Sequence, residues 1–467
     1  MNRNPLDRLD DALHSLADAR LKRWQRLALL GAMAALLFGF LLTRSFPRLE
    51  GNHFGQLAVT AALFAFVGLL FMQAAFSRIS RFEGSLALYL LAAAGCAALL
   101  LMRLSMLEKE TGDYTYWLTK WYTQMQPLGF AQAMRADIGN YTMPYRYFVW
   151  IIAQIPLPDL YLFKLVTMLF EAALAREVML LSEMNAGRPS LGRSLSIYFI
   201  VLALPTVVFN GAYWGQCDAI YTLFALYGLR MALEDKPYRS AAGFGLSLAF
   251  KLQAVFLFPI LPILWGMKRL RVKHALALVG AWLAAMIPAL LSGRSFAGVL
   301  SPYLSQMSDS MELTRNAPSV FQLFDSSEMN PWMFSNWGIA MAMGAAVVLC
   351  MLLWRCRDRL TPARLIDAAF LMALVVPYLL PHMHERYFFI ADMLSIAYFA
   401  GNSRRAFAPA LTILASLNCY LRYFQANRSF MPPALGSLLL LAVLVIAGAE
   451  LMRGLGRRTG AGTDPQG

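Results

Sequence analysis

The chain has 467 residues, of which 59% are hydrophobic and 15% charged, and its mean hydropathy is +0.52. This balance excludes an ordinary water-soluble domain and indicates a polytopic membrane protein. Apolar runs of about 20 residues, the length that a helix needs to cross the hydrocarbon core, recur along the chain without the alternation of barrel strands. The net charge of +14 lies in short Lys and Arg clusters between these runs, which favours a topology signal over a nucleic-acid partner.

Residues 1–24 are charged and lack a small-residue cleavage site, so we expect a cytoplasmic amphipathic N-terminus and no cleaved signal peptide. A single all-α transmembrane domain is predicted over 25–452, with a disordered cytoplasmic tail over 453–467. Its helices are predicted near 25–43, 57–77, 85–103, 160–181, 195–209, 219–231, 241–250, 252–266, 275–291, 338–354, 366–380, 388–400, 407–424 and 434–452. The pattern predicts a bundle of about 12–14 transmembrane helices with both ends in the cytoplasm.

Two long polar segments, residues 104–158 and 293–336, fall on the outer side under this topology, while the basic clusters fall inside. The first contains an apolar run at 149–155 that is too short to cross and is closed by Pro156, so we expect a juxtamembrane helix there. Long loops on a rigid scaffold often carry function. Both outer loops are therefore candidates.

Asp113 follows a glycine in the first outer loop and lies among aromatic residues such as Trp117 and Trp121. A carboxylate beside apolar aromatic surface gains basicity, which suits a general base, and aromatic faces can stack on sugars or lipid isoprenes. An interfacial aromatic belt with a solvated Asp113 is an equally good interpretation of these residues alone.

Two further segments place polar groups at the rim of apolar runs. Residues 140–147 end in tyrosines and Arg146, which could meet a phosphate, although a juxtamembrane anchor is the simpler interpretation. Residues 214–218 place Gln216 and Asp218 between two membrane-length runs. Dehydrating such groups in lipid is costly, so they usually face water, protein or a ligand.

Lys251 and Gln253 lie between apolar runs with no acidic partner nearby in the sequence, so either an anionic ligand or snorkelling explains the cation. His382, His384, Glu385 and Arg386 concentrate charge at one helix mouth, where they could take a phosphate, with Glu385 holding Arg386 in register. The histidine spacing is not that of a zinc protease, and a structural ion pair is the alternative.

At these segments the chain resembles the GT-C superfamily of integral-membrane glycosyltransferases, and most of all the GPI mannosyltransferases and the dolichyl-phosphate-glucose-dependent glucosyltransferases. The similar motifs are Gly112-Asp113-Tyr114, Tyr145-Arg146-Tyr147, Trp214-Gly215-Gln216-Cys217-Asp218, Phe250-Lys251-Leu252-Gln253 and His384-Glu385-Arg386. They occur in the family's order. The chain departs from the family by two extra helices before the usual first one and by a second outer loop without an alignable motif.

The resemblance implies a GT-C-type fold and inverting transfer of a hexose, mannose favoured, from a polyprenyl-phosphate donor on the extracytoplasmic face. Asp113 would deprotonate the acceptor hydroxyl, and Lys251, His384 and Arg386 would hold the donor phosphate. The residues that would bind substrate or brace the site are Tyr114, Tyr145, Arg146, Trp214, Gln216, Asp218, Gln253, His382 and Glu385.

No cofactor is expected to be required, and a need for a divalent metal stays open. The expected partners are the polyprenyl-phosphate sugar, a glycan, glycolipid or protein acceptor, and the lipid bilayer, without nucleic acid. Short cytoplasmic loops and no retention signal favour a bacterial plasma membrane and a cell envelope glycan. The rival hypothesis is a transporter or lipid flippase of envelope glycan precursors, which predicts inverted repeats and broken helices with charges near the midplane.

Overall fold

The computed structural model describes residues 54–82, 84–308, 312–324, 331–426 and 428–456, together with Ala28 and Gly31. The predictions for residues 1–24, for most of the helix near 25–43 and for residues 457–467 lie outside the described part of the chain. Residues 453–456, predicted as the start of a disordered tail, are helical, because the last helix runs on through Gly456. Within the described residues the protein is all-α, as predicted.

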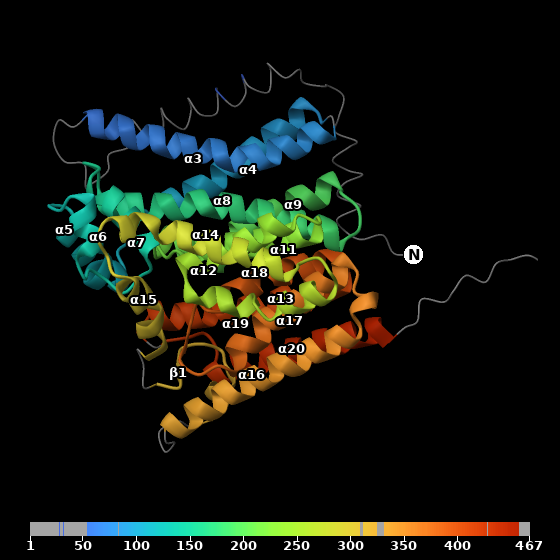
Figure 1. Cartoon of the computed structure of the whole chain (residues 1–467). Coiled ribbons are helices and arrows are strands. Elements are labelled where there is room, and N and C mark those ends of the chain that lie inside the picture. The colour runs from blue at the N-terminus through green and yellow to red at the C-terminus, as the bar shows by residue number, and fades with distance from the viewer. Residues whose placement is uncertain are drawn as a thin grey trace, which may run out of the picture.

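The long helices lie broadly side by side, with α3 and α4 along one side of the bundle and α16 and α20 along the other (Figure 1). Their bounds are α3 (Phe54–Arg81), α4 (Leu86–Leu104), α8 (Asp159–Asn185), α9 (Leu191–Ala203), α11 (Asp218–Leu233), α12 (Pro237–Phe250), α14 (Val272–Leu291), α16 (Pro331–Arg355), α17 (Pro362–Leu379), α18 (Phe389–Gly401), α19 (Phe407–Phe424) and α20 (Pro433–Gly456). Helix α8 is central and packs against α3, α9, α11, α17 and α18.

Short elements connect these helices. They are α10 (Pro205–Val208), η2 (Phe209–Tyr213), η3 (Leu252–Leu257), α13 (Ile260–Gly266), η5 (Arg357–Arg359) and η6 (Ser403–Ala406). Several helices start where the sequence supplies a suitable residue: proline stands in the first turn of α12 and α17, where its missing N–H leaves no helical hydrogen bond unmade. Helix α4 is capped by the Ser85 side chain, which accepts from the Leu88 amide.

Six helices in the described part of the chain are long and apolar enough to cross a bilayer, and a seventh span arises if α9 is joined to the segment Pro205–Tyr213 across a 48° bend. The polytopic class is confirmed, but this number is below the predicted 12–14. Helices α11, α12 and α18 have 16, 14 and 13 residues, which is short for a crossing. Helix α8 is long enough but carries ionisable residues such as Lys164, Glu171 and Glu183.

Buried charges on α8 are paired inside the bundle. Arg103 of α4 donates to Glu171 at 2.7 Å, and its Nη2 donates to the carbonyl of Leu202 in α9, also at 2.7 Å. Both side chains are almost fully buried. Removing one partner of such a pair leaves an uncompensated charge in the interior, so the pair ties α4, α8 and α9 together.

The first outer loop folds into short helices at one end of the bundle, at the left of Figure 1. They are η1 (Tyr114–Leu118), a π-helix, followed by α5 (Thr119–Met125), α6 (Phe130–Arg135) and α7 (Met143–Ala153). The predicted juxtamembrane helices are therefore present. Helix α7 begins at Met143, before the predicted start at 149, because Pro144 opens it as a first-turn proline.

The second outer loop is also structured at this end of the bundle (Figure 1). It contains α15 (Phe296–Ser308), β1 (Thr314–Arg315) and η4 (Val320–Leu323). Strand β1 pairs in parallel with β2 (Met383–His384), so that Arg315 is opposite His384. This pairing attaches the second outer loop to the predicted His-Glu-Arg segment.

Candidate active site

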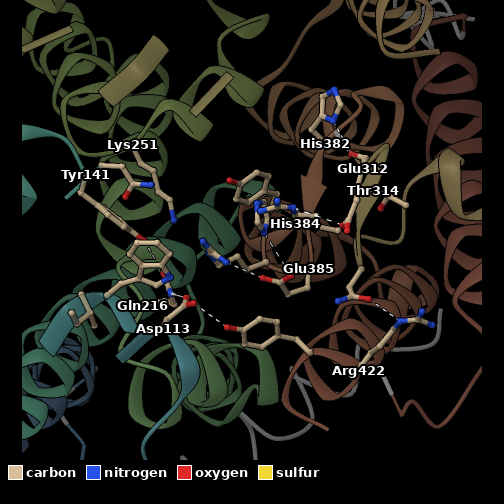
Figure 2. A pocket seen from close by; sticks show the side chains of 18 of the residues that line it. Asp113, Tyr141, Gln216, Lys251, Glu312, Thr314, His382, His384, Glu385 and Arg422 are labelled. Atoms are coloured by element: carbon tan, nitrogen blue, oxygen red, sulfur yellow. Dashed lines mark hydrogen bonds and ion pairs between the residues drawn. The ribbon is translucent and has the colours of Figure 1, made fainter. Parts of the chain in front are cut away.

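A polar cavity of about 860 Å³ lies where the two outer loops meet the helix ends. Its walls come from segments far apart in the sequence, shown in Figure 2. The predicted site residues that line it are Asp113, Gln216, Lys251, His382, His384, Glu385 and Arg386. The sequence-predicted acid and the three predicted phosphate ligands are thus brought to one cavity.

Asp113 is half-buried and is held by three neutral donors. Its Oδ2 accepts from Trp214 Nε1 at 3.0 Å and from Gln216 Nε2 at 2.6 Å, while its Oδ1 accepts from the Tyr423 hydroxyl at 2.9 Å. In the described part of the chain no cation lies within ion-pair distance of this carboxylate. A carboxylate offers about four acceptor positions, so one position on Oδ1 is left for another hydroxyl group.

The backbone around Gly215 aims two of these donors at Asp113. Helix η2 ends at Tyr213, and Gly215 then adopts a φ of +78°, in the left-handed region that favours glycine. Gln216 is fixed on its other side, because its Oε1 accepts from the Tyr141 hydroxyl at 3.1 Å. That bond leaves the Gln216 amide N–H₂ directed at Asp113.

Lys251 and Arg386 share one buried carboxylate, that of Asp218. Lys251 forms an ion pair with Asp218 Oδ1, and Arg386 Nε lies 3.6 Å from Asp218 Oδ2, which also accepts from Asn210 Nδ2 at 2.7 Å. The sequence shows no acidic partner near Lys251, and the structure supplies one from a distant segment, Asp218 at the start of α11. Asp218 is fully buried behind the cavity wall and braces the two cations.

Lys251 reaches the cavity because the chain is extended between α12 and η3, with a φ of −158°. Its ammonium also lies 5.7 Å from the centre of the Tyr141 ring and 5.6 Å from that of Tyr221. Cation–π contacts of this kind stabilise a partly desolvated ammonium group. The break predicted at Lys251 is therefore where the cation enters the site.

Arg386 is oriented by Glu385 and by aromatic rings. Its Nη1 donates to Glu385 Oε1 at 2.8 Å, as the sequence predicted, and its guanidinium lies 5.1 Å from the Trp214 ring centre and 5.7 Å from that of Tyr387. Burial raises the pKa of Glu385, although Arg386 opposes that rise. A planar guanidinium held in this way can offer its remaining N–H groups to an oxyanion.

His384 is not the cation that the sequence suggested. Burial, and next the charges of Arg386, Arg315 and Lys251, lower its pKa from 6.5 to about 2. Its Nδ1 lies 3.8 Å from Glu385 Oε2. The imidazole is therefore neutral in the free protein and acts as a hydrogen-bonding group.

His382 joins three segments and has a φ of +61°. Its Nε2 is 2.8 Å from the Ser335 hydroxyl, and its Nδ1 is 2.7 Å from the backbone carbonyl of Glu312. Its backbone N–H donates to the carbonyl of Leu313 at 2.9 Å. His382 is thus a brace between the second outer loop, the start of α16 and the segment before α18.

Six predicted site residues do not line the cavity: Trp214 and Asp218, which support it from behind, and Tyr114, Tyr145, Arg146 and Gln253. The Tyr114 hydroxyl donates to both carboxylate oxygens of Asp159 at 3.0 Å. Arg146 is buried outside the cavity lining, and its Nη2 donates to backbone carbonyls at the end of α6, at 2.5 and 3.1 Å, so it braces that end of the helix. Tyr145 and Gln253 are buried behind the wall.

Several residues that line the cavity were missed by sequence reasoning. They are Asn140, Thr314, Arg315, Asn316 and Gln322 from the outer loops, and Arg422 and Tyr423 from the end of α19. One signal was available for the last pair. Arg422 is a cation at the predicted outer end of an apolar helix, against the positive-inside tendency, and its Nε donates to Asn316 Oδ1 at 2.7 Å.

The sequence profile described as Glycosyltransferase family 87 matches residues 140–381, which is more than half of the chain. The chain belongs to glycosyltransferase family 87. This family is GT-C-like, so the resemblance to membrane glycosyltransferases is confirmed at that level. The matched segment includes Gln216 and Lys251 but neither Asp113 nor Arg386. No curated protein matches the chain.

The described residues contain no group of three His, Cys, Asp or Glu side chains placed to hold a metal ion. The cavity instead combines one acid bound by neutral donors with cations bound by acids, among them Lys251 and Arg386. That arrangement can accept a proton at one place and stabilise an anion at another.

Proposed function

We propose that this family 87 glycosyltransferase moves a hexose, mannose favoured, from a polyprenyl-phosphate carrier to an acceptor hydroxyl with inversion at the sugar carbon. The reaction takes place at the extracytoplasmic face of a bacterial plasma membrane and builds an envelope glycan. One observation carries the proposal: Asp113 lines the same cavity as Lys251, His384 and Arg386. These groups match the proton that the acceptor loses and the charge that the leaving phosphate gains.

Asp113 acts as the general base through Oδ1. The acceptor hydroxyl gives its proton to the open position on Oδ1 while its oxygen bonds to the anomeric carbon of the donor sugar. The bond from that carbon to the phosphate oxygen breaks, and its electron pair leaves with the polyprenyl phosphate. Trp214, Gln216 and Tyr423 keep the carboxylate in one orientation during this step.

Lys251 and Arg386 stabilise the leaving phosphate. In the free protein Asp218 and Glu385 hold both cations at the cavity wall, so they need no reorganisation when the donor arrives. The phosphate gains charge as the glycosidic bond breaks, and the attraction to both cations therefore grows toward the transition state. His384 adds a neutral hydrogen bond.

The placement of the site supports an outer, lipid-accessible reaction. The basic end of α20, which carries Arg453, lies at the end of the bundle opposite to α5 and β1 (Figure 1). Under the positive-inside rule the cavity end is then extracytoplasmic. Apolar side chains such as Leu276 and Leu291 project from α14 and are strongly exposed, which suits contact with lipid tails.

The proposal is tested with the purified protein in lipid nanodiscs. Polyprenyl-phosphate mannose, polyprenyl-phosphate glucose and GDP-mannose are compared as labelled donors, with octyl α-mannoside as the acceptor probe. We expect release of polyprenyl phosphate, a preference for the mannosyl lipid, and a product whose new linkage has the anomeric configuration opposite to that of the donor. Equal or better use of GDP-mannose, or retention of configuration, would contradict the proposal.

A further inference from the structure

We infer that the acceptor is a saccharide and that its ring stacks on the indole of Trp117 at the mouth of the cavity. This inference rests on the proposed function and names the acceptor class of the same site. It keeps two of the three acceptor types that the sequence left open, a glycan and the sugar part of a glycolipid, and excludes a protein hydroxyl.

Trp117 is an exposed aromatic face beside the base. It stands four residues after Asp113 within η1, lines the cavity and is 54% exposed. In the described part of the chain its indole N–H has no hydrogen-bond partner and its ring has no aromatic neighbour. Tryptophan offers a large apolar face with low conformational freedom, which suits the flat apolar face of a pyranose.

The rings of two other tryptophans near Asp113 are already in contact with other protein groups. Trp214 donates to Asp113 and stacks on Tyr423, with ring centres 4.5 Å apart. Trp121 is buried, meets the Tyr141 ring edge-on at 5.4 Å, and is approached so closely by Gly139 that a side chain there would lie 2.7 Å from the indole. Only Trp117 among the three presents a free face to the cavity.

The facing wall is suited to sugar hydroxyls. Besides the charged groups of Glu312, Arg315 and Arg422, it carries a hydroxyl and two amides, from Thr314, Asn316 and Gln322, and Figure 2 places Thr314 across the cavity from Asp113. Amide groups both donate and accept, as sugar hydroxyls do, and Arg422 fixes the orientation of Asn316. A saccharide can meet several of these groups at once, whereas a simple lipid alcohol offers a single hydroxyl.

The size of the cavity agrees with two sugars. Its volume of about 860 Å³ lies in the upper part of the range of roughly 300–1,000 Å³ found for pockets that hold a whole drug-sized ligand. The donor contributes one hexose and a phosphate, since its lipid tail lies in the bilayer. The remaining space accommodates a second ring next to Asp113.

Tyr116 supplies a matched control. It is the neighbouring residue in η1 and is 74% exposed, but it does not line the cavity. If Trp117 only anchored the first outer loop in the membrane interface, its replacement and that of Tyr116 would have similar effects. If Trp117 is the acceptor platform, only its own replacement weakens acceptor binding.

The experiment uses the full chain in nanodiscs with polyprenyl-phosphate mannose and three acceptor probes: octyl α-mannoside, dodecanol and a Ser/Thr-containing peptide. We expect transfer to the mannoside alone. Trp117→Ala should raise KM for octyl α-mannoside at least tenfold and leave KM for the donor unchanged. Trp117→Phe should recover part of the loss, and Tyr116→Ala should change neither constant.

Different results would contradict the acceptor platform at Trp117 and the transferase activity itself. Transfer to dodecanol or to the peptide at a rate comparable with the mannoside, or an equal acceptor KM in Trp117→Ala and Tyr116→Ala, would overturn the saccharide platform and leave the transferase in place. Absence of polyprenyl phosphate release with every probe would overturn the proposed function and the platform with it.

Discussion

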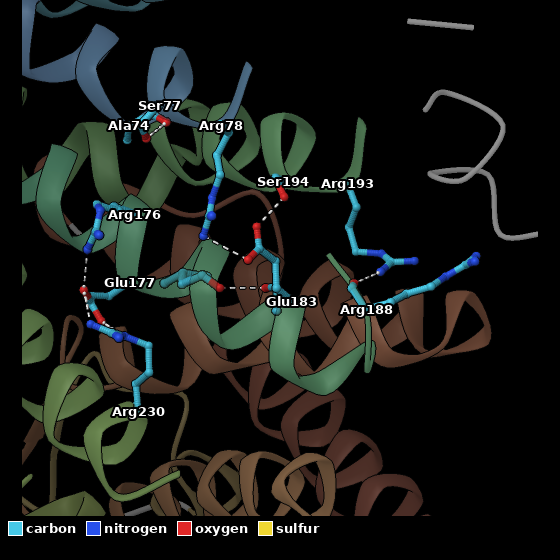
Figure 3. Close-up of polar contacts among 12 residues, drawn as sticks. Ala74, Ser77, Arg78, Arg176, Glu177, Glu183, Arg188, Arg193, Ser194 and Arg230 are labelled. Carbon is cyan, nitrogen blue, oxygen red and sulfur yellow. Dashed lines mark hydrogen bonds and ion pairs between the residues drawn. The ribbon is translucent and has the colours of Figure 1, made fainter. Parts of the chain in front are cut away.

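Asp113, at the cavity, and Glu177, within the central helix α8, are both carboxylates, but they have different kinds of partner. At the cavity end, Asp113 accepts hydrogen bonds from an indole, an amide and a phenol. At the other end, Glu177 accepts from Arg230 Nη2 at 3.0 Å and from Arg176 at 3.1 Å, and Glu183 accepts from Arg78 at 2.9 Å (Figure 3).

This difference in partners distinguishes carboxylates that hold helices together from a carboxylate that is available for a reaction. A carboxylate paired with arginine has its charge compensated, so Glu177 and Glu183 serve to join helices. Asp113 keeps its charge uncompensated by any cation in the described residues, and it faces open space. Burial alone does not identify a site; the charge of the partner and the adjoining cavity do.

The largest effect should come from exchanging the two acids for amides. Asp113→Asn should lower kcat by about a thousandfold, in line with the loss of a general base, and leave the apparent Tm nearly unchanged. Glu177→Gln should lower the apparent Tm and leave kcat per folded molecule nearly unchanged, because it leaves Arg230 without its full counter-charge in a buried position. Turnover and thermal unfolding of both variants in nanodiscs test this. Wild-type turnover in Asp113→Asn would show that Asp113 is not the general base.

A second comparison exchanges the arginines. Arg386→Met should lower kcat about a hundredfold, because it removes a donor to the leaving phosphate. Arg230→Met should lower the apparent Tm while the protein that stays folded keeps its kcat per active molecule. Single-turnover release of labelled polyprenyl phosphate measures the first, and thermal unfolding the second. Equal kcat losses in the two variants would mean that Arg386 is only structural.

Tyr423 gives a smaller and more local test. Tyr423→Phe removes one hydrogen bond to Asp113 Oδ1, worth about 1 kcal/mol, so kcat should fall about fivefold to tenfold with donor KM unchanged. Tyr213→Phe is the control, because both tyrosine rings pack on Phe424, with centres 4.8 and 5.3 Å away, and only Tyr423 reaches the carboxylate. Equal kcat values in the two variants would dismiss the orienting role.

The smallest expected effect concerns acid stability. The pKa of His384 falls from 6.5 to about 2 on folding, so the unfolded chain binds the extra proton between these values and stability is lost as the pH drops below 6.5. The facing groups are the cations Arg386, Arg315 and Lys251 and the acid Glu385. His384→Gln should therefore lose less apparent Tm than the wild type between pH 7 and pH 5. A steeper loss in the variant would contradict the neutral imidazole.

The sequence predicted the elements that depend on local pattern. Helix α19 has the predicted bounds, 407–424, because an apolar run there lies between charged ends. Lys251 and Arg386 were singled out because each is an ionisable residue at the edge of such a run, and Asp113 because it lies among aromatic residues in a long polar loop. The free-energy cost of an ionisable group beside an apolar run is large enough that such residues stand out in the sequence alone.

The partners of these residues could not be predicted, because they are set by packing between distant segments. Tyr423 is separated from Asp113 by 310 positions, and Asp218 from Lys251 by 33. The second outer loop shows no motif, yet its strand β1 reaches the cavity by pairing with β2. In the described part of the chain fewer helices than the predicted 12–14 are long and apolar enough to cross, because helices such as α12, with 14 residues, carry an apolar pattern but are short for a crossing.

The winding of η1 and η2 has a consequence for insertions and deletions. Both segments are π-helical, and they adjoin the two motifs that supply the carboxylate and its indole and amide donors. A π-turn carries one residue more than an α-turn, and each residue of an α-helix advances about 100° around the axis. Asp113 directly precedes η1 and Trp214 directly follows η2, so a deletion or insertion that changes the length of either segment should displace one partner of the hydrogen bond between them.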